Sequence, residues 1–323
     1  MNPTPIILNN TDFQTIIVTV MFPFEETVAD LAKIQLLPNM LNKMNNKYPS
    51  EETWQLAKKK AYILRTNCSK SVIGTTGCFS FDLVIPDVKS LEKDVLDKQF
   101  SLFSELIYNP KVSNNQFGEE ELTREIDNVR LGMDNALKNI RPYHSIRLRE
   151  LVDDEGILSR GLIHHQELLD EITPVNLYEY YLKVIKNAQP VIYIMGDVDS
   201  KRITSLCEKY LYQKKFELKT YNANFDNFLK PRKDILNIEE DSTFKDSVFS
   251  LVYKVKDMCH DDVILLNALR DILASMSSRL LAEKLRDEND LIYSSKVMIY
   301  PHFGLFEITV YINKNNIDLV KEK

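Results

Sequence analysis

Two amide side chains, Gln35 and Asn39, lie four residues apart in the stretch QLLPNML near the start of the chain. Residues at this spacing share one face of an α-helix, so their side chains can act on one bound group. A catalytic zinc ion needs imidazole or carboxylate ligands and a carboxylate that takes the proton of the bound water. Amides are poor zinc ligands, and Pro38 offers no base. The stretch therefore predicts a helix without a zinc site.

Other residues of catalytic type form no familiar site. His164 and His165 are adjacent, so their side chains point to different sides of a helix or strand and cannot easily share one metal ion. We expect them in a surface turn. The sequence holds no G-x-S-x-G motif and no arrangement of Ser, Cys and His that resembles a known triad. An independent hydrolase of these types is therefore disfavoured.

Composition excludes several classes of protein. The chain has 323 residues, of which 44% are apolar, and can form two domains with sizeable cores. A net charge of -6 without a basic cluster argues against nucleic acid as a partner. The apolar runs are shorter than the roughly 20 residues that cross a bilayer, and the N-terminus lacks the pattern of a signal peptide. We therefore expect a cytoplasmic protein without a membrane span.

The cysteines agree with that compartment. They are scattered along the chain without C-x-x-C spacing, which predicts reduced, buried thiols rather than disulfides or zinc ligands. The four residues are Cys68, Cys78, Cys207 and Cys259.

Hydrophobic periodicity predicts an α+β chain. Residues 15–22 alternate and are rich in Ile and Val, which is typical of a strand. From Thr27 to Lys43 the apolar residues recur three or four apart as one buried helical stripe, in which Pro38 is expected to cause a kink. The elements expected next are a helix from about 51 to 64, strands at 67–73 and 78–85, helices at 90–108, 114–137 and within 147–186, a strand at 191–195 and a helix at 200–212.

The same order of elements returns after a polar segment. Residues 213–246 lack a sustained period and are interpreted as a linker with one short strand around 235–238. The elements expected beyond it are a strand at 248–255, helices at 263–276 and 279–286, and strands at 292–299 and 305–312. Because Leu36 and Leu265 stand at equivalent places in matching helices, we infer two copies of a strand-helix-helix-strand-strand unit, in domains 1–212 and 247–323.

The second copy is shorter than the first. It stops at Lys323, where its next helix should begin. If the two copies are of similar length, roughly a hundred residues of the second copy are missing. We therefore expect the second domain to be truncated at its C-terminal end.

This order and these apolar motifs resemble the M16 family of zinc peptidases, the insulinase and mitochondrial-processing-peptidase group, over nearly the whole chain. In that family the first long helix carries H-x-x-E-H, often as HFLEHML, in which two His bind zinc and the Glu activates water. Here Gln35 and Asn39 stand in the two His positions and Pro38 in the base position. The resemblance implies two related domains, each a mostly antiparallel sheet packed by helices, that form half of a clamshell without a metal site.

The third zinc ligand of the family is a Glu on a later helix. Glu125, in the sequence Arg124-Glu125-Ile126, best matches the R-E-I-like pattern of that helix. No His partners remain, and charge runs on helices usually face water. We therefore expect Glu125 on a solvated acidic face.

A second family segment is retained. SSRLLAEKLRDENDLIYSS resembles S-R-L-x-x-x-L-R-x-x-x-x-L-x-Y, whose Arg and Tyr contact the bound peptide near the scissile bond in M16 enzymes. The matching residues are Arg286 and Tyr293. An Arg can form a charge-assisted bond to a peptide carbonyl, and a Tyr hydroxyl can steady a developing oxyanion. The alternative is an Arg paired with Asp287 or Glu288 at a helix end and a Tyr packed on a strand.

One bacterial branch of the family divides the clamshell between two chains, of which one holds the zinc motif and the other supplies the Arg and Tyr. This sequence has the second pattern. We therefore predict a pseudoenzyme, the noncatalytic, substrate-binding subunit of a heterodimeric M16B-type zinc peptidase that cuts peptides or matures a peptide product. The chain itself would bind no cofactor, and zinc would lie in a partner subunit that carries H-x-x-E-H.

Two alternatives belong to other classes of protein. The first is a structural or scaffold subunit, because core proteins of a respiratory complex are similar to this family and do no proteolysis. The second is a peptide-binding carrier that uses the same chamber without cleavage.

Overall fold

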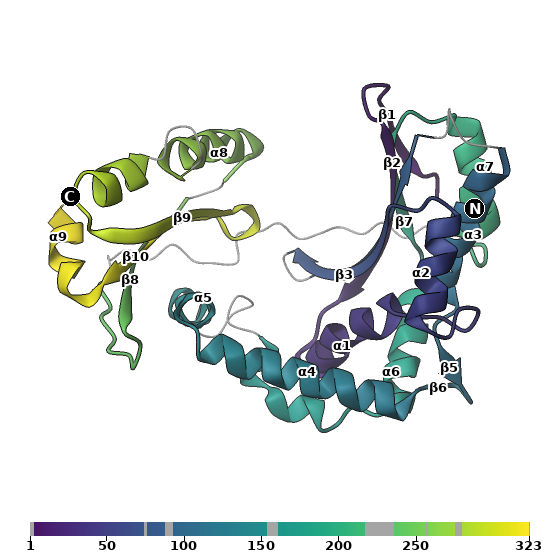
Figure 1. The fold of residues 1–323 in the computed structure, drawn as a ribbon, viewed down its shortest axis with the longest axis horizontal. Helices are drawn as coiled ribbons and strands as arrows, with labels where there is room; N and C mark the ends of the chain where they lie inside the picture. The colour runs from purple at the N-terminus through teal and green to yellow at the C-terminus, as the bar shows by residue number, and fades with distance from the viewer. Residues whose placement is uncertain are drawn as a thin grey trace. The chain divides into compact units, whose positions relative to one another are not determined.

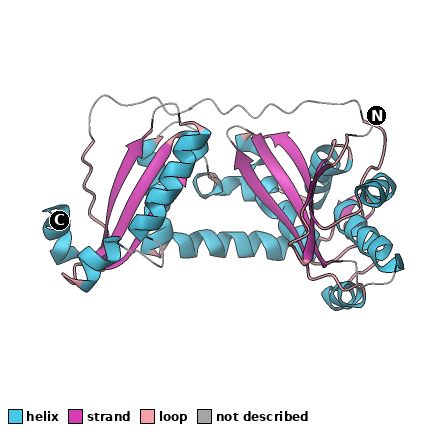
Figure 2. Cartoon of the chain, turned by 90° about the horizontal axis from the view of Figure 1, so that it is seen from above, coloured by secondary structure: helices cyan, strands magenta, loops and turns pink. Residues whose placement is uncertain are grey.

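The computed structural model describes residues 3–73, 76–87, 93–153, 161–216, 236–255, 258–274 and 280–322. The chain divides into two compact units, each with its own sheet and helices (Figures 1 and 2). Unit 1 comprises Met1–Met133 and Arg160–Asn224, and unit 2 comprises Asp134–Ser159 and Phe225–Lys323.

The main sheet of unit 1 has the strand order β1-β7-β2-β4-β3. Only β1 and β7 pair in parallel, and the other neighbours are antiparallel. Alternate residues of β2, including Val18 and Phe22, are fully buried, as the period of a strand with one face on the core requires. The strands are β1 (Ile6–Asn9), β2 (Thr15–Glu25), β3 (Arg65–Ile73), β4 (Thr76–Pro86) and β7 (Val191–Gly196).

Helices pack against this sheet and against one another. The longer ones are α1 (Leu31–Asn42), α2 (Glu51–Lys60), α3 (Lys93–Tyr108), α4 (Glu119–Leu137), α6 (Pro174–Tyr181) and α7 (Ser200–Tyr210), the last residues of α4 belonging to unit 2. Shorter turns of helix are η1 (Val28–Asp30), η3 (Leu162–His164), η4 (Gln166–Leu169) and η5 (Leu182–Lys186).

The first of these helices, α1, has the expected apolar stripe. Leu31, Ile34, Leu37 and Leu41 recur at helical spacing and are buried in the unit 1 core. The helix continues through Pro38 to Asn42. The stripe therefore fixes the direction in which the polar edge of the helix points.

The next helix begins where its sequence indicates. Ser50 is the N-cap of α2, and its hydroxyl accepts the backbone N–H of Thr53, while the Thr53 hydroxyl accepts the N–H of Ser50. This reciprocal capping box satisfies two backbone donors at the helix start.

Unit 2 is built on a three-stranded antiparallel sheet of order β8-β10-β9. Its apolar core consists of Leu285, Leu291, Ile292, Val310, Ile312 and Val320. The elements are α5 (Ile140–Val152), β8 (Asp246–Lys254), α8 (His260–Ala274), η6 (Ala282–Asp287), β9 (Ile292–Tyr300), η7 (Pro301–Phe303), β10 (Leu305–Asn313), η8 (Lys314–Asn316) and α9 (Ile317–Glu322).

The two faces of this sheet differ in polarity. On β10, Val310 and Ile312 join the apolar core, whereas Thr309 and Tyr311 alternate with them and lie on the other face. Arg141 of α5 covers that face, with its guanidinium 4.3 Å from the centre of the Tyr311 ring.

A helix of unit 2 leaves an apolar stripe exposed. None of the side chains of α8 is buried. The exposed residues recur at helical spacing on one side: Ile264, Leu265, Leu269 and Ile272. The described part of unit 2 therefore has a smaller core than its apolar sequence would allow.

The unit 2 sheet repeats part of the unit 1 sheet in order. Along the chain, β2, β3 and β4 have the spatial order β2-β4-β3, and β8, β9 and β10 have the order β8-β10-β9. In both sets the third strand is central and antiparallel to the other two.

Some elements differ from those that the sequence predicts. The helix expected from Asn114 begins at Glu119, because Val112–Ser113 and Gln116–Phe117 first form a hairpin, β5 and β6. Its two turn residues, Asn114 and Asn115, have φ values of 51° and 58°, as a tight hairpin turn requires.

The predicted linker can be compared with the structure only in part. Residues 217–235 lie outside the described part of the chain, and 236–238 are not in a strand. The short strand expected there is therefore wrong over its described residues.

The cysteines follow the prediction with one exception. Cys68, Cys78 and Cys207 are buried and free, but Cys259 is exposed. Burial raises the pKa of all three buried thiols, that of Cys207 to about 12. These three thiols are therefore neutral at physiological pH, because their pKa lies above it.

Within the described residues, no helix has the length and apolarity needed to cross a membrane.

Leu37→Ala should lower the free energy of unfolding of unit 1 by about 2–5 kcal/mol, because Leu37 is fully buried and its loss leaves a cavity. The fluorescence of Trp54, the single Trp of the chain and fully buried in unit 1, can follow urea unfolding. The exposed Leu56 of α2 gives the control, and Leu56→Ala should change stability by less than about 0.5 kcal/mol. Equal losses in the two variants would contradict the proposed packing of α1.

Candidate functional site

The polar edge of α1 borders a small charged hollow. Of the three residues of interest on α1, Asn39 lines it, whereas Gln35 and Pro38 do not. The hollow is shallow and open to solvent. Its lining residues are Asn39, Met40, Lys43, Met44, Lys111, Gly118, Glu121, Arg124 and Glu125.

Glu125 lies in the wall of this hollow and not on a solvated helix face. It is 5% exposed, and one of its carboxylate oxygens is 2.5 Å from the ammonium nitrogen of Lys43. The expectation of a solvated position is therefore wrong. The charged residues of α4 lie on more than one side of the helix. Glu125 lies on the side that also holds the buried Leu122 and Val129.

A second ion pair, between Lys111 and Glu121, also lines the hollow. Lys111 donates to Glu121 at 2.8 Å, and this bond lowers the pKa of the Glu121 carboxyl. Arg124 lies exposed at the rim. Three cationic groups and two carboxylates thus face one another here.

These residues do not fit a zinc ion. The described part of the chain contains no group of three His, Cys, Asp or Glu side chains that could hold a metal. Asn39 offers only an amide, and the carboxylate of Glu125 already accepts the ammonium group of Lys43. The hollow can bind charged or polar groups but has no arrangement for activating water.

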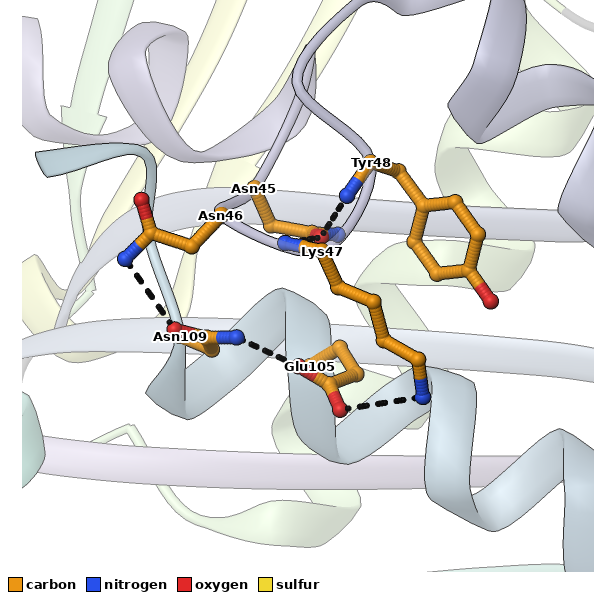
Figure 3. A network of polar contacts seen from close by, with 6 residues as sticks. All are labelled: Asn45, Asn46, Lys47, Tyr48, Glu105 and Asn109. Carbon is orange, nitrogen blue, oxygen red and sulfur yellow. Dashed lines mark hydrogen bonds and ion pairs between the residues drawn. The ribbon is translucent and has the colours of Figure 1, made fainter.

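The loop that follows Lys43 is fixed from within. Asn45 is buried, and its side-chain oxygen accepts the backbone N–H groups of Lys47 at 3.1 Å and Tyr48 at 2.9 Å (Figure 3). An Asn side chain that closes a loop in this way replaces the backbone bonds of a regular turn.

The same loop is also tied to the end of α3 (Figure 3). The amide of Asn46 donates to Asn109 at 3.2 Å, and Asn109 donates to Glu105 at 2.6 Å. The ammonium group of Lys47 lies 3.4 Å from Glu105. These contacts hold the chain just beyond Lys43 and so help to fix its ammonium group at Glu125.

In unit 2, Arg286 lies in the last turn of the short helix η6, at the surface. Its side chain is 39% exposed, and its Nε atom donates to the neighbouring Asp287 at 2.8 Å. This pair matches the alternative interpretation of the sequence, an ion pair at a helix end. It leaves part of the guanidinium open to solvent.

Tyr293 is 54% exposed on β9. It is the extra residue of a β-bulge, because Ser294 pairs with Tyr311 and Ile292 with Ile312, which leaves Tyr293 without an opposite residue. A bulge turns a side chain away from the regular direction of its strand. Among the described contacts, no hydrogen bond joins Tyr293 to Arg286, so the structure places both in unit 2 but does not bring them together.

A buried polar chain in unit 2 was not predicted. His144 of α5 is 2.9 Å from the Ser250 hydroxyl, which is 2.7 Å from the Thr309 hydroxyl. Thr309 donates to Glu307 at 2.7 Å, and Tyr300 donates to the other oxygen of Glu307 at 2.9 Å. The carboxylate is held by hydroxyl groups and is not in contact with the imidazole, so this is not the order of a hydrolytic triad.

The sequence alone indicates only part of this chain of polar residues. The alternation of polar and apolar residues from Glu307 to Tyr311 indicates a polar strand face, but His144 lies more than a hundred residues away on a helix. Periodicity identifies such faces and not their partners.

Lys43→Met should destabilise unit 1 by about 1–3 kcal/mol, because the buried carboxylate of Glu125 loses its partner. Adding Glu125→Gln should recover much of that loss, since the neutral amide needs no cation. Urea unfolding of the single and double variants measures the coupling. Lys111→Met, which breaks the more exposed pair with Glu121, is the control and should cost less than about 1 kcal/mol. Additive effects at Lys43 and Glu125 would contradict the role of this pair.

Acidification should destabilise unit 2 through His144. Burial lowers the pKa of this imidazole below 6.5, partly against the influence of Glu307. The unfolded chain then binds the proton more tightly, so stability falls as the pH drops below about 6.5. Hydrogen exchange of β8 and β10 between pH 7 and 5 should show this loss, and His144→Gln should reduce it. His260→Gln, at the exposed start of α8, is the control. An unchanged pH dependence in His144→Gln would exclude His144 as its source.

Comparison with known proteins shows which family this chain resembles. Residues 171–323 match the family described as the peptidase M16 inactive domain. Over 295 residues the chain is 22% identical to the "Probable inactive metalloprotease YmfF" of Bacillus subtilis (strain 168), a match that covers 90% of this chain and 68% of the relative.

Solved structures share the fold at low identity. A conserved protein from Enterococcus faecalis V583 is similar with a TM-score of 0.76 and 19% identity, over 98% of this chain and 74% of that one. A peptidase M16 inactive domain from Pseudomonas fluorescens is similar with a TM-score of 0.69 and 14% identity, over the same shares of 98% and 74%. The family match over residues 171–323 and these likenesses show that the chain shares the fold of M16 peptidase-like proteins and is similar to the peptidase M16 inactive domain.

Proposed function

We propose that this chain is the noncatalytic, substrate-binding subunit of a heterodimeric M16B-type zinc peptidase that cuts peptides or matures a peptide product. The partner subunit carries H-x-x-E-H and the zinc ion, and Arg286 and Tyr293 of this chain contact the peptide. The observation that carries the proposal is the contrast between the two sites. The α1 position has lost every zinc ligand, whereas Arg286 and Tyr293 remain exposed to a ligand.

The contact of Arg286 with Asp287 is compatible with this role. Both side chains are partly exposed, and an ion pair in water contributes only about 0–1 kcal/mol. A peptide carbonyl or carboxylate can therefore replace Asp287 at little cost. The planar guanidinium offers several donors to such a group.

The bulge at Tyr293 supports the second part of the proposal. The side chain stands on a strand that is paired on both sides of the bulge with β10, yet its own position has no cross-strand neighbour. The hydrogen-bonded strand thus presents the hydroxyl where a ligand can contact it.

The proposal includes two domains of related design. Residues 1–212 would form the first and 247–323 the second, joined by the linker at 213–246. The shared strand order of β2-β4-β3 and β8-β10-β9 supports this relation. The free cysteines are compatible with a cytoplasmic location, which the proposal adopts.

Arg286→Ala should lower kcat/KM about tenfold or more in a complex with an M16 chain that has an intact zinc motif, because the peptide loses a charge-assisted bond. Tyr293→Phe should mainly lower kcat if its hydroxyl steadies the oxyanion, with a loss of up to about a hundredfold. Cleavage of a fluorogenic peptide library by the copurified pair measures both values.

Matched controls lie on the same unit. Arg270 pairs with the adjacent Asp271 as Arg286 does with Asp287, and Tyr253 is an exposed Tyr on β8. Arg270→Ala and Tyr253→Phe should leave the kinetics unchanged. Full activity in Arg286→Ala would remove the assisting role, and a stable assembly that cleaves no peptide would favour the scaffold subunit.

A further inference from the structure

The β-bulge at Tyr293 is contacted from one side by α5. Arg141, in the first turn of that helix, donates from its guanidinium group to the hydroxyl oxygen of Ser294 at 2.8 Å. The central carbon of the same guanidinium lies 4.3 Å from the centre of the Tyr311 ring. Ser294 and Tyr311 are opposite each other in the ladder, directly beside the bulge. One cationic group therefore contacts both members of this cross-strand pair.

The bulge has an alternative position on the same two strands. Between the pairs Ile292 with Ile312 and Ser294 with Tyr311, β9 holds one additional residue, which is Tyr293. If the bulge moved by one residue, Tyr293 would lie opposite Tyr311 and Ser294 would have no partner. An aromatic cross-strand pair is itself favourable, so the two strands alone do not exclude this arrangement. A contact from outside the strands is needed to select the observed one.

The contacts of Arg141 favour the observed position. In the alternative arrangement, the ring of Tyr293 would take the place of the small Ser294 side chain beneath the guanidinium. Arg141 would then lose its hydrogen bond, and the larger side chain would displace it from the ring of Tyr311. The pairing of Ser294 with Tyr311 is therefore stabilised, and Tyr293 stays the unpaired residue.

The surroundings of Arg141 are held by other contacts. His144 follows three residues later on the same face of α5, with its Nε2 atom 2.9 Å from the Ser250 hydroxyl and its ring edge-on to Tyr311 at 6.5 Å. On the other side of the bulge, Ile292 is buried in the unit 2 core. Arg141 itself is exposed. Removing its side chain should therefore change the bulge without unfolding the unit.

We propose that Arg141 is a positioning residue for Tyr293, which fixes the bulge of β9 at that residue and so keeps the Tyr293 side chain exposed and not opposite Tyr311. Arg141 acts through Ser294 and Tyr311 and does not itself contact the peptide. The peptide contact of Tyr293 rests on the function proposed above, whereas the position of the bulge does not.

The first test follows Tyr293 in the full chain without a partner subunit. The chain is labelled with a fluorinated tyrosine, and the fluorine NMR signal that is missing from Tyr293→Phe belongs to this residue. A soluble paramagnetic agent broadens the signals of exposed rings. In Arg141→Ala we expect a second Tyr293 signal that is less sensitive to the agent by about threefold or more, because the ring of the shifted register lies beneath α5.

Two further variants separate the bulge from the docking of α5. Arg147 binds Glu150 and Glu240 from the same helix and makes no described bond to β9, so the Tyr293 signal should be unchanged in Arg147→Ala. Ser294→Ala removes the acceptor for Arg141 and should change the signal in the same direction as Arg141→Ala, but less. It also serves as the test if Arg141→Ala does not fold.

The second test measures kinetics in a complex with an M16 chain that has an intact zinc motif. Arg141→Ala should lower kcat about tenfold with little change in KM, because it displaces a hydroxyl that acts in the transition state. In the Tyr293→Phe background it should cause no further loss, since both substitutions remove the same contact. Arg147→Ala should keep the activity of the unchanged chain.

An unchanged Tyr293 signal in both Arg141→Ala and Ser294→Ala would overturn the proposal. An equal change in Arg147→Ala would also overturn it, because the cause would then be a general loosening of α5. Additive losses of kcat in the double variant would show that Arg141 does not act through Tyr293. Full activity of Tyr293→Phe would contradict only the function proposed for Tyr293, and the fluorine spectra would then decide the role of Arg141.

Discussion

The burial of α1 against the unit 1 sheet is the constraint on which the rest of that unit depends. Its apolar stripe, which includes Ile34 and Leu37, must stay inside because the core closes around it. The polar edge that carries Gln35 and Asn39 is outside that constraint. Side chains there can change from metal ligands to amides without disturbing the core. This separation of faces explains how the buried stripe of α1 is compatible with edge residues that cannot hold a metal ion.

Buried carboxylates in the two units are stabilised in different ways. Glu125 in unit 1 faces the ammonium group of Lys43, whereas Glu307 in unit 2 accepts hydrogen bonds from the hydroxyls of Thr309 and Tyr300. An ion pair with a partly exposed cation is weakened by salt, but short hydrogen bonds inside a sheet are screened much less. The first arrangement preserves charge balance in a hollow that is open to water. The second fixes the geometry of a sheet face beneath α5.

The sequence located most elements but few of the contacts between them. Alternation and helical periodicity are local properties, and they were sufficient for β2, α1 and the strands of unit 2. The position of Glu125 was missed because the rule that charge runs face water describes an average helix, and Lys43 lies far upstream. The polar chain through His144 was missed for the same reason, since Ser250 comes from a distant strand. The prediction that α1 holds no zinc ion rests on residue types at fixed spacing within one helix, which the sequence alone provides.

The thin core of unit 2 has a further consequence. In its described part, α8 buries no side chain, and only a few apolar residues pack around β10. Regions with few buried contacts open at a lower free energy than the rest of a protein. Arg286 and Tyr293 belong to this unit, so a ligand that they hold would also shift its opening equilibrium towards the closed state. Recognition and local order would then be thermodynamically linked in the same few strands.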